Sequence, residues 1–215
     1  VLSWMNEHVP AIVQAWQGGT RAGRAVADVL FGAVNPSGKL TASFPRTEGQ
    51  IPVFYAHKST GRPVEERGVI QFNRAHKSQY LDELNTPLYG FGYGLSYTTF
   101  DYSDMAVETP EVGLDDEVRV SVTVTNTGDR AGDEIVQLYV QDLVGEVPRP
   151  VRELKGFTRI SLEPGEAKRV TLTVLVSELS FHGLDMEPIV EPGEFKVWVG
   201  PHAYEGLEGT FCLVD

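Results

Sequence analysis

The sequence has little cysteine and no long apolar run. Cys212 is the single cysteine among 215 residues, which excludes an internal disulfide. We interpret it as a small buried apolar residue rather than a reactive thiol. The five histidines are scattered, and no Cys/His cluster has the spacing of a metal site. No apolar stretch approaches the roughly 18 residues that a membrane helix needs. We therefore expect no metal, no cofactor and no membrane partner.

Basic residues are scarce in the second half of the chain. Residues 1–98 hold nine Lys/Arg and seven Asp/Glu, whereas residues 99–215 hold nine Lys/Arg and 23 Asp/Glu, within a net charge of −12. An acidic module repels phosphate backbones and anionic lipid surfaces. Nucleic acid is therefore excluded as an expected partner, and solubility of an exposed domain explains the charge.

The start of the chain lacks both an initiator Met and the basic lead and apolar core of a secretion signal. We expect that residue 1 is not the natural start of the polypeptide. The compartment stays open, with a bacterial periplasmic or extracellular location favoured over a cytoplasmic one. A homodimer also stays open.

The first half shows an alternating pattern of strand-like and helix-like segments. After Val1–Ser3, interpreted as the tail of a buried strand, Val9–Trp16 ends in a short apolar strand, and Ala22–Phe31 has helical spacing that Gly32 ends. We expect a turn at Asn35–Gly38 and then a strand at Lys39–Phe44, which alternates up to a proline. This order is typical of a mostly parallel sheet with helical cover.

This half holds too little apolar sequence to form a core alone. It provides about three strands and one good helix, and residues 46–86 are polar and mixed. We therefore expect the rest of this α/β layer to come from another polypeptide segment. The loop Gly18–Gly23 lacks both the P-loop lysine and the dinucleotide G-x-G-x-x-G spacing, so nucleotide binding is nearly excluded.

The stretch Pro87–Phe100 contains three glycines, three tyrosines, two phenylalanines and no charge. Glycines at alternate positions make a poor strand and a worse helix. We expect an irregular path in which rings pack against closely approaching backbone. Residues 87–98 are therefore predicted to be a linker held between two domains.

Beyond the linker, the hydrophobic period changes to two. Val118, Val120, Val122 and Val124 alternate with polar residues, and turn signals such as Glu163–Glu166 and Glu191–Glu194 separate the apolar runs. Phe195 and Trp198 flank an alternating strand, so we expect them to pack in the core. The pattern predicts an immunoglobulin or fibronectin type III-like sandwich over residues 99–215 without its disulfide, with seven short strands: Tyr102–Val107, 118–125, Ile135–Val140, Leu154–Ile160, Arg169–Val174, Phe195–Val199 and Thr210–Val214.

An ordered set of motifs covers nearly the whole chain. Each motif is weak alone, but the set closely resembles the C-terminal portion of glycoside hydrolase family 3, the β-glucosidase and β-xylosidase type. The segments are Ala15–Trp16, Ala27–Gly32, Asn35–Leu40, Ser43–Arg46, Gln50–Val53, Thr60–Pro63, Leu88–Phe100, Val124–Gly128, Gln137–Val140, Arg149–Phe157 and Glu191–Phe195.

The resemblance implies a TIM-like barrel, then an α/β sandwich domain, then a fibronectin type III-like domain. On that mapping the fold class is α/β plus all-β. Residues 1–86 are the C-terminal part of an incomplete α/β sandwich domain with a substrate-side loop at 54–86, and residues 99–215 are the complete third domain. The barrel is not in this sequence.

Family members are retaining glycosidases, which need two carboxyls about 5–5.5 Å apart. The resemblance implies a nucleophilic Asp in a Ser-Asp-Trp context on the barrel and a Glu acid/base earlier in the second domain. Neither motif occurs here, and Ser103-Asp104 is followed by Met. We assign no catalytic residue to this chain, because adjacent acids such as Glu65-Glu66 and Asp82-Glu83 are expected by chance.

The loop 54–86 is the candidate substrate-binding segment. Long loops without secondary structure are usually functional or disordered, and rings with Arg and Asn donors suit a carbohydrate cleft. We predict substrate contacts from His57, Arg62, Asn73 and Tyr80. The alternative is a solvated surface loop held by pairs between Arg62 and carboxylates. The segment 77–80 reads Lys-Ser-Gln-Tyr where the family leads us to expect Ser-Arg-Tyr.

Two functions therefore stay open. In the first, the chain is the C-terminal segment of a retaining β-glycosidase, most readily a β-glucosidase acting on a β-glucoside or oligosaccharide, and it works only with an N-terminal segment. In the second, the β-sandwich is a non-catalytic carbohydrate-binding or structural module.

Overall fold

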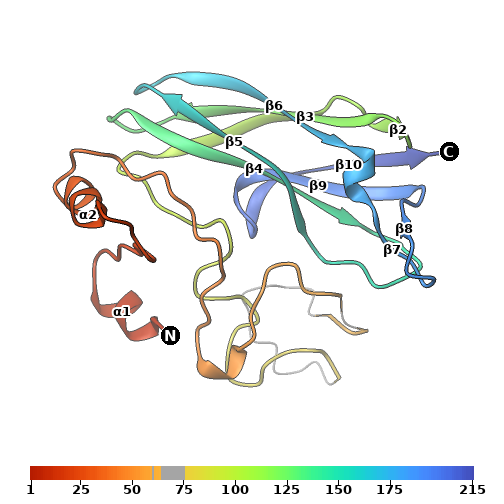
Figure 1. The fold of residues 1–215 in the computed structure, drawn as a ribbon, viewed down its shortest axis with the longest axis horizontal. Helices are drawn as coiled ribbons and strands as arrows, with labels where there is room; N and C mark the ends of the chain where they lie inside the picture. Colours follow the sequence, from red (N-terminus) through yellow and green to blue (C-terminus); the bar gives the residue numbers. More distant parts are fainter. Residues whose placement is uncertain (60, 64–75) are drawn as a thin grey trace.

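A computed structural model describes residues 1–59, 61–63 and 76–215 of the chain. Figure 1 shows a β-sandwich with the N-terminal half running along one side of it. That half contains the helices α1 (Ser3–His8) and α2 (Ala22–Leu30) and the short 3-10 helix η1 (Glu48–Gln50). The all-β second half predicted from the sequence is confirmed by this arrangement.

The helix predicted at Ala22–Phe31 is confirmed as α2. Gly32 takes a positive φ of 74°, the left-handed conformation that commonly ends a helix. The amide of Phe31 donates to the carbonyl of Ala27 at 2.9 Å, and the amide of Gly32 donates to that of Val29 at 3.0 Å. The periodicity and the glycine were therefore sufficient to locate both the helix and its end.

The strands predicted at Val9–Trp16 and Lys39–Phe44 are wrong, because neither segment forms a strand. The strand tail predicted at Val1–Ser3 is also wrong, because the helix α1 begins at Ser3. A strand needs a neighbouring strand to pair with its backbone. Here the Lys39–Phe44 segment pairs irregularly with the glycine-rich run. Leu40 bonds to Tyr93 and Gly92 through its backbone, and Phe44 forms an isolated antiparallel bridge with Tyr89. The turn predicted at 35–38 is also absent.

The second half forms two antiparallel layers with one small extra hairpin. The first sheet has the order β1-β3-β6, and the second, which is otherwise antiparallel, has the order β2-β10-β9-β4-β5 with β2 parallel to β10. All seven predicted strands are present; the structure adds β2, β7 and β8, which are too short to show a period. The bounds are β1 Phe100–Val107, β2 Glu111–Gly113, β3 Glu117–Asn126, β4 Gly132–Asp142, β5 Glu153–Leu162, β6 Ala167–Leu175, η2 Val176–Leu179, β7 Phe181–His182, β8 Pro188–Ile189, β9 Gly193–His202 and β10 Glu205–Val214.

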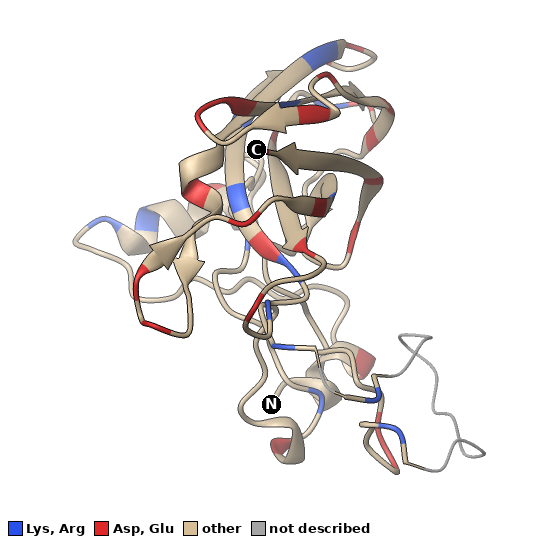
Figure 2. Cartoon of the chain, turned by 90° about the vertical axis from the view of Figure 1, so that its right-hand side faces the viewer, with Lys and Arg blue, Asp and Glu red and all other residues tan. Residues whose placement is uncertain are grey.

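The core lies between the two sheets and follows the alternation of the sequence. The four alternating valines of β3 are buried, as are Val136 and Leu138 of β4 and Phe195 of β9. Phe195 stacks on Phe211 with 5.1 Å between ring centroids. Acidic residues are distributed over the strands and connections of this module (Figure 2).

The prediction that Cys212 is buried is wrong. In β10 the side chains of Phe211 and Leu213 point into the core, so Cys212 between them points outward and is exposed. The period of two that buries its neighbours excludes it from the core.

Candidate functional site

The outer face of the second sheet is covered by the N-terminal half. Tyr139 of β4 and Trp198 of β9 are buried on that face. The residues on either side of them in each strand point the other way, into the core between the sheets. Tyr55 and Phe91 cover them, with their own rings stacked at 4.2 Å between centroids. The two halves of the chain therefore share a second, aromatic cluster. Trp198 packs in this cluster and not in the main core, so its predicted burial is confirmed on the opposite face.

The glycine-rich run crosses this face at very short range, as predicted. A Cβ atom on Gly90 would lie 2.4 Å from the ring of Tyr204, and one on Gly92 would lie 2.1 Å from Oε1 of Gln137. Gly92 also has φ +80°. The amide nitrogen of the Gln137 side chain donates to the carbonyl of Gly92 at 3.2 Å. Side chains are absent from these positions because Tyr204, in the turn between β9 and β10, and Gln137 of β4 occupy their space.

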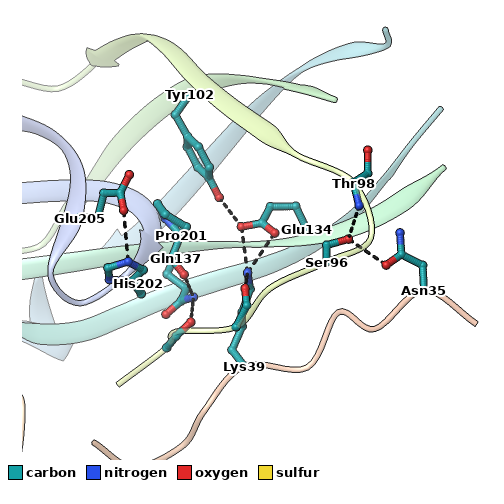
Figure 3. A network of polar contacts seen from close by, with 12 residues as sticks. Asn35, Lys39, Ser96, Thr98, Tyr102, Glu134, Gln137, Pro201, His202 and Glu205 are labelled. Carbon is teal, nitrogen blue, oxygen red and sulfur yellow. Dashed lines mark hydrogen bonds and ion pairs between the residues drawn. The ribbon is translucent and has the colours of Figure 1, made fainter. Parts of the chain in front are cut away.

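A buried ion pair joins the N-terminal half to the sandwich (Figure 3). Nζ of Lys39 donates to both carboxylate oxygens of Glu134, at 3.3 and 3.1 Å, and to the carbonyl of Gly94 at 3.0 Å. The hydroxyl of Tyr102 donates to Glu134 at 2.9 Å, and burial raises the pKa of Tyr102 far above its usual range. Strands β1 and β4 and two N-terminal segments therefore meet at one carboxylate.

Asn35 makes a second connection of the same kind. Its side-chain oxygen accepts from the hydroxyl of Ser96 at 2.9 Å and from the amide of Tyr97 at 2.8 Å. Its side-chain nitrogen donates to the carbonyl of Ala131 at 3.0 Å. The residue predicted to open a turn instead holds the linker against the start of β4.

His202 lies at the edge of this interface, between β9 and the N-terminal half. Burial lowers its pKa, and the carboxylate of Glu205, 3.2 Å from Nε2, opposes that shift. The ring also contacts Tyr93, with 5.5 Å between centroids. The histidine therefore contacts both the sandwich, through Glu205, and the glycine-rich run, through Tyr93.

The candidate loop is fastened to the connection between β4 and β5. The amide of Val151 donates to the carbonyl of His57 at 2.9 Å. Lys58 forms an antiparallel bridge with Pro150, and its Nζ donates to the carbonyl of Pro148 at 2.6 Å. The amide of Leu154 donates to the hydroxyl of Tyr55 at 3.2 Å. Tyr55, which lies in the candidate substrate-binding loop, therefore helps to hold that loop against the start of β5.

An open groove of about 490 Å³ lies between the candidate loop and the sandwich. Of the predicted site residues, the structure brings His57 and Tyr80 together in its lining. Arg62 is not among the lining residues, although its carbonyl accepts from the amide of Ser78 at 2.9 Å. Asn73 lies outside the described residues. Sequence reasoning missed Val151 and Tyr204, which line the groove from the sandwich.

The structure offers no catalytic pair among the described acids near the loop. Asp82 and Glu83 are not among the groove-lining residues, and Glu83 accepts from the amide of Leu84 at 2.7 Å. Glu65 and Glu66 lie outside the described residues. Asp104 is in β1 and accepts from the hydroxyl of Ser103 at 3.0 Å. Across the described ranges, no group of three or more His, Cys, Asp or Glu could hold a metal ion.

Comparison with known families accounts for both halves. Residues 1–97 match the model of the glycosyl hydrolase family 3 C-terminal domain. Residues 134–203 match the model of the fibronectin type III-like domain. The chain belongs to glycoside hydrolase family 3. It corresponds to the C-terminal part of the enzymes of that family, as the ordered motifs predict.

Two relatives are similar along almost the whole chain. It is 46% identical over 209 residues to the periplasmic beta-glucosidase of Salmonella typhimurium, covering 97% of this chain and 27% of that protein. It is 45% identical over 199 residues to a beta-xylosidase of Formosa agariphila, covering 93% of this chain and 26% of that protein. The chain thus spans about a quarter of the length of these relatives.

Solved structures share the fold in full. The beta-glucosidase from Listeria innocua in complex with glucose is 40% identical, with a TM-score of 0.91 over 100% of this chain and 29% of that one. No helix within the described ranges is long and apolar enough to cross a membrane.

Proposed function

We propose that this chain is the C-terminal unit of a retaining β-glycosidase, most readily a β-glucosidase. It acts on a β-glucoside or oligosaccharide together with an N-terminal segment that carries both catalytic carboxylates. The observation that carries the proposal is the 46% identity to a beta-glucosidase along 97% of the chain. The name of that relative also supports a periplasmic location.

The exposed apolar side chains of the N-terminal half support the need for a further segment. Neither α1 nor α2 contains a buried residue. Trp16, Leu30 and Phe31 are exposed, although residues of these types usually lie in a core. We infer that the remainder of the α/β domain covers this surface. The domain limits 1–86, 87–98 and 99–215 form part of the proposal.

The geometry supports a role in holding substrate rather than in cleaving it. A retaining mechanism needs an ionised nucleophile and a protonated acid on either side of the glycosidic bond. The described groove lining contains His57 and Tyr80 but no Asp or Glu. His57 and Tyr80, and by extension Arg62 and Asn73 of the same loop, are proposed to contact substrate.

We expect the purified 215-residue chain to release no nitrophenol from 4-nitrophenyl β-glucoside or β-xyloside above the rate in buffer. The measurement is absorbance over time at high enzyme concentration, with an intact family 3 β-glucosidase as the positive control. Turnover that survives repurification and disappears on substitution of Glu83 or Asp104 would place a catalytic acid in this chain and contradict the proposal.

A further inference from the structure

We propose that the turn between β9 and β10 is an acid-sensitive latch, which holds the glycine-rich run (residues 87–98) against the sandwich while His202 is neutral and loosens its hold when His202 takes up a proton. The latch joins the two halves of the chain, so its state sets how firmly the N-terminal half is docked. This role goes beyond the proposed hydrolysis, because it concerns the joint between the domains and requires no particular substrate.

The turn itself contacts the glycine-rich run. It consists of Ala203 and Tyr204, between β9 and β10. The amide of Ala203 donates to the carbonyl of Phe91 at 3.0 Å. The ring of Tyr204 lies so close to Gly90 that a Cβ atom on the glycine would be 2.4 Å from it. The conformation of this turn therefore decides whether the run stays docked.

The neutral ring of His202 stabilises the turn. Its Nδ1 accepts from the backbone amide of Tyr204 at 3.2 Å. Because a backbone amide can only donate, Nδ1 carries a lone pair and the ring proton is on Nε2, which lies 3.2 Å from a carboxylate oxygen of Glu205 (Figure 3). A second proton makes Nδ1 a donor too, so that two N–H groups face each other and the bond to Tyr204 is lost.

The surroundings of His202 favour the neutral ring. Its side chain is only 16% exposed, and burial is the main reason that its pKa lies below the usual value of 6.5. The cations of Lys39 and Arg152 lower the pKa further. The carboxylate of Glu205 raises it, but that side chain is 72% exposed, so water screens its charge. The other ionisable side chains of the hollow that His202 lines are Arg46, Tyr89, Tyr93 and Tyr204.

The lowered pKa fixes the direction of the pH response. The docked state prefers the neutral ring, so the latch holds fully above about pH 6.5, where the ring is neutral in the released state as well. The hold is lost as the pH falls through the lowered pKa, and it weakens no further once the ring is protonated in both states. We therefore expect the run to loosen on the acid side of pH 6.5.

The test is hydrogen–deuterium exchange, read by mass spectrometry of peptides, on the complete protein that carries this sequence. It is measured at about pH 7.5 and about pH 5, which span the titration of histidine, and each rate is corrected for the effect of pH on unprotected amides. We expect the protection of residues 88–94 and 202–206 to fall at least about fivefold at the lower pH, and that of β3 to change less than about twofold.

Three variants show whether His202 carries this response. In His202→Asn the side-chain oxygen replaces Nδ1 as the acceptor for the amide of Tyr204 and takes up no proton, so we expect no loss of protection in acid. His182→Asn is the matched control, because His182 is exposed in β7, and we expect it to keep the full response. Glu205→Gln removes the charge that favours protonation, so its response should move to a lower pH.

Other results overturn the proposal. A His202→Asn variant that loses as much protection in acid as the unsubstituted protein would assign the response to another group, such as the pair of Lys39 and Glu134. Equal protection of residues 88–94 at both pH values in the unsubstituted protein would remove the latch altogether. A Glu205→Gln response that stays in place or moves to a higher pH would contradict the role of His202 even if His202→Asn did not fold. Because exchange is read without substrate, a failure of the proposed glycosidase function would leave these results unaffected.

Discussion

Replacing Lys39 with Met is expected to lower the free energy of unfolding by about 3–5 kcal/mol, because it leaves a buried carboxylate without its cation. The side chains of Lys39 and Glu134 are only 12% and 3% exposed, so water cannot take over the role of the ammonium group. After the substitution Glu134 retains only the hydroxyl of Tyr102 among its described partners. The measurement is urea unfolding of the 215-residue chain, followed by far-UV circular dichroism and tryptophan fluorescence.

The matched control for this experiment is Arg24→Met. Arg24 pairs with Asp28 at 3.5 Å on the surface of α2, and its side chain is 82% exposed. An exposed pair of this kind contributes roughly 0–1 kcal/mol. The double variant Lys39→Met, Glu134→Gln should recover part of the loss, because it removes the unpaired charge as well. Equal effects of Lys39→Met and Arg24→Met would show that the ion pair does not hold the halves together.

Replacing Gly92 with Ala is expected to cost about 2–4 kcal/mol. A left-handed conformation costs an L-residue roughly 1–2 kcal/mol, and Gly92 has φ +80°. Its new Cβ would also lie 2.1 Å from Oε1 of Gln137 and 2.8 Å from the hydroxyl of Tyr139, an overpacking that adds roughly 1–3 kcal/mol. The same urea titration measures the loss.

Gly38→Ala is the control for this substitution. It lies in the facing segment, and a Cβ there would meet nothing within 4 Å. We expect its effect to be within about 0.5 kcal/mol, as is usual for a surface substitution. A Gly92→Ala variant as stable as Gly38→Ala would mean that the glycine-rich run is not in close contact with β4.

The sandwich was predictable because its signals are local. Alternating valines such as Val120 and Val122 bury one face of a strand whatever the neighbouring strands are. The glycine that ends α2 is equally local. The three missed strands, for example Phe181–His182, contain two or three residues and show no period.

The errors concern residues whose environment is set by distant parts of the chain. Lys39–Phe44 alternates like a strand, but its backbone hydrogen-bonds to the irregular segment Leu88–Tyr93 and not to a strand. Val151 lies 94 positions from His57, so no spacing rule relates them. Gln137 and Tyr139 are buried on the outer face of β4 because the linker covers them. Only tertiary packing brings the groove together.

The most direct test of the account joins this chain to the upstream part of the periplasmic beta-glucosidase of Salmonella typhimurium, in place of the matching 27% of that enzyme. The measurement is kcat/KM for 4-nitrophenyl β-glucoside. We expect the joined protein to hydrolyse it and the upstream part alone to be inactive. A joined protein that folds but remains inactive, or an upstream part as active alone as when joined, would contradict the claim that this chain completes a glycosidase whose catalytic acids lie elsewhere.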